Sequence, residues 1–116
     1  MNKYRDKSDF EINKAVFVAA KINHDDTDLS GSKVFYGNGA KWIEFDPCND
    51  PADAMPIIFD NNISLIFSHK EYPLATNNPS GLFRDALPPK NVVTNKNPLR
   101  AAMELFLMMK DAENES

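Results

Sequence analysis

Four acidic or thiol side chains stand close together near the middle of the chain, and their donor chemistry could bind a metal ion. They are Asp46, Cys48, Asp50 and Asp53. Zinc sites combine several Cys or His ligands at tight spacing, whereas this cluster offers one sulfur and its nearest histidines in sequence are His24 and His69. We therefore predict no metal ion and interpret Asp50 as a helix cap and Cys48 as a small buried residue.

Two further patterns could carry chemistry but are explained more simply as structure. Residues 26–31 place oxygen-bearing side chains at alternate positions with a glycine at the sixth, as in the first half of a calcium loop. The twelfth position needs a bidentate Glu and is Gly37, so we interpret residues 24–32 as a polar loop. Cys48 and a histidine could pair as nucleophile and base, yet any chain with one Cys and two His allows this pairing. We predict no catalytic residue and no cofactor.

Binding chemistry is indicated at two other places. Arg100 falls in the first turn of a predicted helix, where the helix dipole disfavours a cation. It is therefore either an exposed residue without a role or the partner of a carboxylate, with Asp50 and Asp53 as candidates. Trp42, the single tryptophan, either packs on a sheet or anchors a binding surface. The candidate binding residues are Trp42, Asn49, Asp50, Asp53, Asn97 and Arg100.

Length and composition restrict the class of protein. The chain has 116 residues and a net charge of −4, so we expect one domain over residues 1–116 and no nucleic-acid partner. A single cysteine, a polar N-terminus and the absence of a long apolar run predict a cytoplasmic protein that does not enter the membrane. The acidity is concentrated in residues 24–60, which carry eight Asp/Glu against two Lys/Arg. Such a segment is either a solvated face or a surface directed at a basic partner.

Capping signals predict three helices, over residues 9–20, 51–60 and 98–111. Ser8 followed by Glu11 has the spacing of a capping box. Asp50 and Asn97 each precede a proline, which pairs a capping side chain with a residue suited to the first helical position. Pro56 is expected to kink the second helix or to divide it.

The last helix is apolar around most of its circumference, which predicts burial on several sides or a second face buried in an oligomer. We expect the chain to be flexible over residues 1–7 and 112–116 and irregular over 69–96, where four prolines forbid a long helix.

Strands are predicted at three or four places. Residues 34–36 and 42–45 flank Gly37-Asn38-Gly39, a strong hairpin signal, with Trp42 and Glu44 on one face of the second strand. Residues 63–68 alternate as a strand, and Val92-Val93 could form a short edge strand. The predicted fold class is therefore α+β: a small, mainly antiparallel sheet, made of a hairpin and one or two further strands, packed with about three helices on one face.

Three blocks of sequence together resemble a known family. They are residues 9–14 (Asp-Phe-Glu-Ile-Asn-Lys), residues 48–58 (Cys-Asn-Asp-Pro-Ala-Asp-Ala-Met-Pro-Ile-Ile), and residues 97–103 (Asn-Pro-Leu-Arg-Ala-Ala-Met) with 106–109 (Phe-Leu-Met-Met). Their order and spacing are similar to those of the NinX-like family of lambdoid phage and prophage proteins, over about residues 8–110. The resemblance implies a phage or prophage accessory protein made in a bacterial host's cytoplasm, and it implies no catalytic residue.

Two functions remain open from the sequence. The first is a non-enzymatic accessory protein that binds a host or phage protein through its acidic surface and the exposed part of the last helix. The alternative is a binder of a small, nucleotide-like ligand that sequesters it as an oligomer, since helix starts suit anions.

Overall fold

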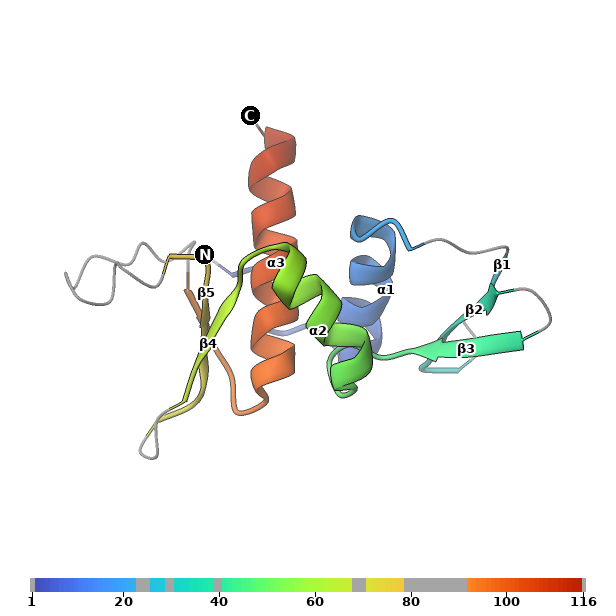
Figure 1. Ribbon diagram of the computed structural model, residues 1–116, viewed down its shortest axis with the longest axis horizontal. Helices are drawn as coiled ribbons and strands as arrows, with labels where there is room; N and C mark the ends of the chain where they lie inside the picture. Colours follow the sequence, from blue (N-terminus) through green and yellow to red (C-terminus); the bar gives the residue numbers. More distant parts are fainter. Residues whose placement is uncertain are drawn as a thin grey trace.

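A long C-terminal helix runs through the middle of the molecule, between two small sheets (Figure 1). The computed structural model describes residues 2–22, 26–28, 31–38, 41–67, 71–78 and 92–115. Those residues form three helices and six strands in the order α1 (Asp9–Ala19), β1 (Asp26–Asp28), β2 (Val34–Asn38), β3 (Lys41–Phe45), α2 (Pro51–Asp60), β4 (Ser64–Ile66), β5 (Leu74–Thr76), β6 (Val92–Thr94) and α3 (Pro98–Glu115). The predicted α+β class with three helices is confirmed.

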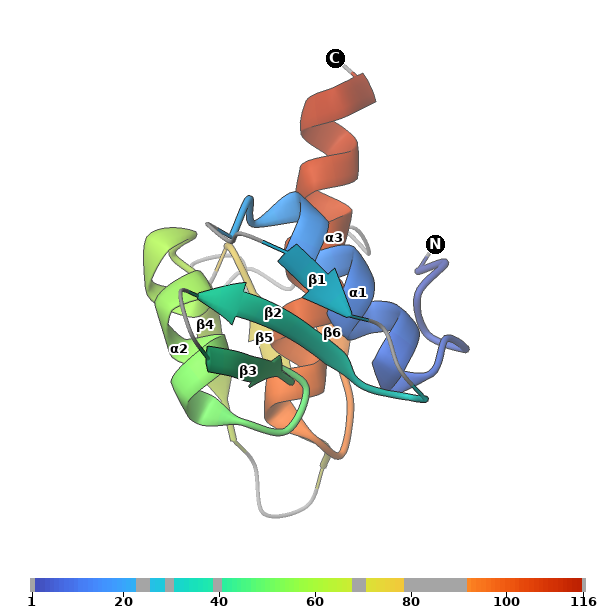
Figure 2. The ribbon, with the colours of Figure 1, turned by 90° about the vertical axis from the view of Figure 1, so that its right-hand side faces the viewer.

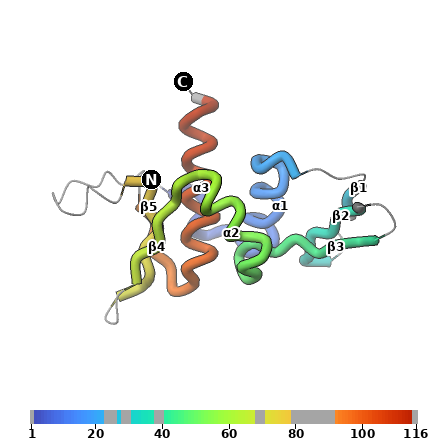
Figure 3. Tube along the Cα trace, viewed as in Figure 1, coloured from blue at the N-terminus to red at the C-terminus, as the bar shows by residue number. Residues whose placement is uncertain are grey.

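Helix α3 forms the centre of the core because its first half is apolar on nearly every side. Residues 101–107 are all buried, and α3 packs against α1, α2, β5 and β6. The chain passes from the β1–β3 sheet through α2 to β4 on the other side of this helix (Figure 3). Burial of α3 on several sides is therefore confirmed.

The predicted capping signals form in all three helices. Ser8 and Glu11 make a complete capping box on α1, and Asp50 caps α2 by accepting the N–H of Ala52. Asn97 caps α3 by accepting the N–H groups of Leu99 and Arg100. Pro56 does not divide α2, which runs unbroken from Pro51 to Asp60.

Residues 2–4 contact helix α3. In the segment that was expected to be flexible, Asn2 donates a hydrogen bond to Glu104 and Tyr4 donates one to Asp111. Helix α3 continues to Glu115 instead of ending at Asp111. Tyr4 and Lys3 contact Asp111, the residue at which the helix was predicted to end.

The first sheet contains the predicted hairpin and one strand that the sequence pattern missed. Its order is β1-β2-β3, and β2 pairs with β3 so that Asn38 is opposite Lys41. Gly37 and Asn38 therefore belong to β2, and the two connecting residues lie outside the described part of the chain. Strand β1 falls in the segment predicted as a polar loop, because Asp26–Asp28 has no apolar alternation to indicate a strand.

An aromatic cluster joins this sheet to α1. Phe17 packs on Tyr36 and Phe45 with ring centroids 5.6 and 5.5 Å apart. Phe45 is buried and Ile43 half-buried, whereas Trp42 and Glu44 are exposed, so the predicted alternation along β3 is confirmed.

The second sheet lies on the other side of α3, and its order is β4-β5-β6. The strands thus divide between two sheets, where the sequence predicted one. Strand β4 is shorter than the predicted 63–68, and β6 is the predicted edge strand at Val92-Val93, extended by Thr94. Strand β5 was missed because the prolines around it indicated irregular structure over 69–96. None of the helices formed by the described residues combines the length and apolar character that crossing a bilayer requires.

Candidate functional site

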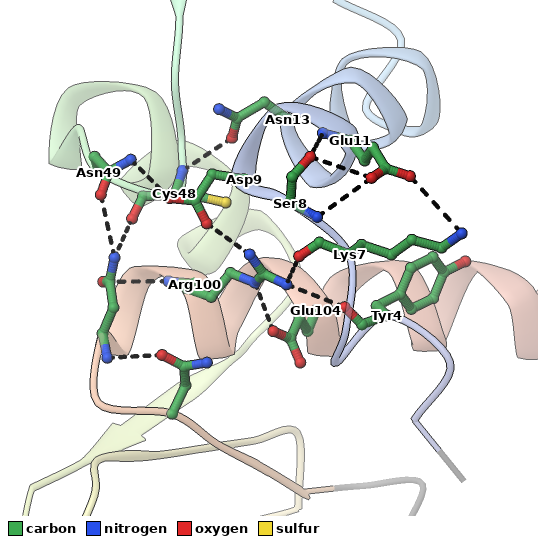
Figure 4. Close-up of polar contacts among 12 residues, drawn as sticks. Tyr4, Lys7, Ser8, Asp9, Glu11, Asn13, Cys48, Asn49, Arg100 and Glu104 are labelled. Carbon is green, nitrogen blue, oxygen red and sulfur yellow. Dashed lines mark hydrogen bonds and ion pairs between the residues drawn. The ribbon is translucent and has the colours of Figure 1, made fainter. Parts of the chain in front are cut away.

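Arg100 is the centre of a buried polar network that joins α3 to α1 and to the N-terminal segment (Figure 4). Its Nη1 donates to a carboxylate oxygen of Asp9 and its Nε to Glu104, both at 2.6 Å. Its Nη2 donates to the main-chain carbonyls of Tyr4 and Lys7, at 3.1 and 2.6 Å. Of the two interpretations that the sequence left open for Arg100, the structure has the one with carboxylate partners.

The identity of those partners differs from the prediction. Asp50 and Asp53 were the expected carboxylates, but Asp50 caps α2 and Asp53 accepts the N–H of Asp46 at 2.9 Å. Helix α1 brings Asp9 to Arg100 instead, and Glu104 lies one turn along the same helix. The spacing of four residues between Arg100 and Glu104 was a signal that could have been used.

The electrostatics of Arg100 make it a structural cation. Burial lowers the pKa of its guanidinium, but hydrogen bonds to Asp9 and Glu104 outweigh this effect and the pKa is raised. Four of the five N–H donors of a guanidinium are used by these contacts. Most of its hydrogen-bonding capacity is therefore used by other described residues of the fold.

Asn97 and Asn49 connect the start of α3 to the segment before α2. The Nδ2 of Asn97 donates to the carbonyl of Cys48 at 2.6 Å and to Oδ1 of Asn49 at 3.3 Å. The Nδ2 of Asn49 donates in turn to Asp9 and Asp46. These predicted binding residues thus lie together, and each makes contacts inside the fold.

The Asn13 side chain, which the sequence did not single out, fixes the segment before α2. This buried amide donates to Asp46 at 2.8 Å and accepts the N–H of Cys48 at 3.1 Å. Cys48 itself is fully buried, and this burial, with Asp9 nearby, raises the pKa of its thiol. A thiol in this state is a poor nucleophile and a poor metal ligand.

Carboxylates gather where β3 ends and α2 begins. Burial raises the pKa of Asp53, and the nearby charges of Asp50, Asp46 and Glu44 raise it further, against the effect of its hydrogen bond to the main chain of Asp46. Glu44 and Asp50 are exposed. The acidic residues predicted as a surface therefore interact with one another in the folded protein. Within the described residues, no group of three His, Cys, Asp or Glu side chains is arranged to hold a metal ion.

A polar hollow of about 370 Å³ brings three of the six predicted binding residues together. Asn49, Asn97 and Arg100 line it with six other residues: Arg5, Asp6, Lys7, Asp9, Asn95 and Lys96. The main-chain donors of the first turn of α3 are already used, because Leu99 and Arg100 bind the Asn97 side chain and the N–H of Ala101 binds its carbonyl. The remaining ligand chemistry of this hollow comes from its basic side chains.

Trp42 lies away from this hollow, on the β1–β3 sheet. It is opposite Gly37 of β2 and is 56% exposed. Figure 2 shows the three strands in front of α1, with the opposite face of the sheet turned to the viewer. Trp42 lies on that face, because its neighbours Ile43 and Phe45 alternate with it and Phe45 packs on α1.

The sequence comparisons identify the family. The family model described as "Bacteriophage P22, NinX" matches residues 3–110. A comparison with curated proteins and one with solved structures give no match. The matched range contains the Ser8–Glu11 capping box, the segment before α2 and the network of Arg100. The chain therefore belongs to the NinX family of bacteriophage proteins.

Proposed function

We propose that this phage protein is a non-enzymatic accessory protein that works in the cytoplasm of the bacterial host and binds a host or phage protein. The observation that supports this proposal is the acidic surface at the junction of β3 and α2. Glu44 and Asp50 are exposed there, and Asp46 and Asp53 are half-buried. The charges of the other three carboxylates raise the pKa of Asp53. Such a surface attracts basic partners and accelerates their association.

The exposed end of α3 contributes less than the sequence suggested. Residues 112–114 are exposed but are polar or small, and the apolar residues before them face the core or are half-buried. An interface needs a buried apolar centre as well as polar contacts. The binding surface is therefore proposed on the side of the β1–β3 sheet, and α3 is part of the core and not of the surface.

A small-ligand function is the second candidate, because the polar hollow beside α3 contains Arg5, Lys7 and Lys96. A phosphate-bearing ligand would bind through these three cations, since the first-turn N–H groups and most donors of Arg100 are occupied. The acidic residues Asp6 and Asp9 line the same hollow and oppose an anion. The hollow still has four cations against two carboxylates, and this excess of positive charge is the observation that supports the second candidate.

The test is native mass spectrometry of the tagged protein captured from bacteria infected by the phage, with the tag alone as control. The protein-binding function predicts a second polypeptide at fixed stoichiometry, released as salt is raised because screening weakens surface ion pairs. A retained small mass in step with the number of subunits would support the ligand function instead. Capture of the chain by itself, with neither, would contradict both.

A further inference from the structure

The outward face of the β1–β3 sheet combines aromatic and acidic positions, and no described element covers it (Figure 2). The strand register places six positions on this outer sheet face: Asp26, Asp28, Phe35, Gly37, Trp42 and Glu44. The inner face is identified by Tyr36 and Phe45, which pack on Phe17 of α1. Because side chains alternate along a strand, Phe35, Trp42 and Glu44 point away from the core.

The two aromatic residues of the outer sheet face lack the packing expected of core aromatics. Trp42 is exposed, and Phe35 is half-buried but does not pack against the buried core, unlike its neighbour Tyr36. A tryptophan opposite a glycine covers the bare backbone of that residue, which gives Trp42 a local structural role. That role leaves more than half of Trp42 exposed, and exposed tryptophans are typical anchors of interfaces.

The charge of this face selects the partner. Three of its six positions are acidic. One of them, Glu44, also lies near the carboxylates at the start of α2, because its charge acts on Asp53. The basic residue within the three strands is Lys41 of β3, and its register position opposite Asn38 is on the other face of the sheet, with Ile43 and Phe45. A nucleic acid would be repelled by this surface, and a second copy would set like charges against one another.

We propose that the outer sheet face binds an arginine-bearing, basic segment of a protein partner; this inference rests on the proposed protein-binding function. A guanidinium stacks on the faces of Trp42 and Phe35 and pairs with a carboxylate in the same contact. Lysine matches only the charge, because its ammonium group has no plane to stack. The surface therefore prefers arginine to lysine at equal charge.

The test uses a synthetic peptide of six arginines, with a six-lysine peptide for comparison. Trp42 is the only tryptophan, so its fluorescence reports binding at the outer sheet face directly. We expect saturable binding of the arginine peptide with a Kd below about 1 mM, weaker binding of the lysine peptide, and backbone amide shifts in ¹⁵N spectra confined to β1–β3 and the start of α2. Shifts centred on another part of the molecule, or equal affinity for the two peptides, would overturn the proposal.

Two triple variants separate a specific surface from general attraction to an acidic protein. Asp26→Asn, Asp28→Asn and Glu44→Gln remove the charges of the outer sheet face, and about a tenfold loss of affinity is expected from three surface ion pairs. Asp6→Asn, Asp60→Asn and Glu71→Gln change the net charge equally at exposed positions elsewhere, and affinity should stay within about twofold. Equal losses in the two variants would overturn the proposal.

The capture experiment in infected cells distinguishes this inference from the proposed function. If the wild-type protein and the outer-face triple variant retain the same protein partner, the protein-binding function holds and the outer sheet face is the wrong surface. If the outer sheet face mediates self-association, sedimentation will show a dimer that the outer-face variant abolishes, which also contradicts the proposal.

Discussion

Arg100 of α3 and Asp9 of α1 form an ion pair of 2.6 Å between residues 91 positions apart in the sequence. The same guanidinium reaches Glu104, which is 1% exposed. Arg100 therefore joins the last helix to the first through Asp9, and it neutralises the buried carboxylate of Glu104.

Replacing Arg100 by methionine should destabilise the protein by about 3–5 kcal/mol, because the buried carboxylate of Glu104 is left without its cation. Urea unfolding followed by circular dichroism measures the change. Combining the replacement with Glu104→Leu should recover part of the loss, since no charge then remains buried. A loss below about 1 kcal/mol for Arg100→Met, the size of a surface ion pair, would contradict the structural role.

Asn97 should contribute to stability through two separate contacts. Asn97→Ala removes the cap of α3 and the hydrogen bond to the Cys48 carbonyl, and a loss of about 2 kcal/mol is expected. Asn97→Ser retains a capping oxygen but cannot reach that carbonyl, so about half of the loss should remain. Equal stability of the two variants in urea unfolding would show that the cap contributes nothing, and a serine variant as stable as wild type would show that the contact with Cys48 contributes nothing.

The capping box on α1 predicts a dependence of stability on pH. The main-chain N–H and the hydroxyl of Ser8 donate to Glu11 and, with Lys7 and Lys14 nearby, lower its pKa below the ordinary 4.5. Because the folded-state pKa is the lower one, the stabilisation is present above pH 4.5 and is lost as pH falls through the folded-state value. Wild type should therefore exceed Glu11→Gln in stability near pH 7, with the difference shrinking in acid. Parallel pH profiles of the midpoint of thermal unfolding would contradict this.

The Cys48 thiol should be unreactive in the folded protein. It is fully buried, and its raised pKa keeps it protonated at neutral pH, whereas a thiol reagent needs accessible thiolate. Modification by a chromogenic disulfide reagent at pH 8 should be at least about 100-fold slower than in urea, because it requires an opening of the structure. Reaction at the rate of the unfolded chain would show that the thiol is accessible in the folded protein and would contradict the interpretation of Cys48 as a buried, unreactive residue.

The sequence predicted the elements whose signals are local. Ser8 with Glu11, Asp50 with Pro51 and Asn97 with Pro98 mark helix starts within a few residues, and the structure has all three. Asn-Gly flanked by apolar strands likewise predicted β2 and β3. Strands β1 and β5 were missed because each has only three residues, which are too few to show an alternation of apolar and polar side chains, and each is held by pairing with its neighbouring strands.

For the candidate site residues too, the sequence indicated which residues to consider, whereas their partners and exposure depend on how the elements pack. The position of Arg100 in the first turn of α3 left open whether it had a carboxylate partner, and only the packing of α1 on α3 gives it Asp9. The sequence singled out Trp42, yet its exposure depends on which face of the sheet meets α1. Segment 2–7 was expected to be flexible because its partners, Glu104 and Asp111, lie about a hundred residues away.

The central claim is that the outer sheet face is the binding surface, and site-specific photo-crosslinking in infected bacteria tests it most directly. A photoreactive phenylalanine analogue would replace Trp42 in one variant and Phe59 in another, since Phe59 is 71% exposed on α2 and provides a matched aromatic control. The account predicts one protein adduct from position 42, joined through a segment that contains arginine, and no such adduct from position 59. An adduct from position 59 alone, or none from position 42, would contradict it.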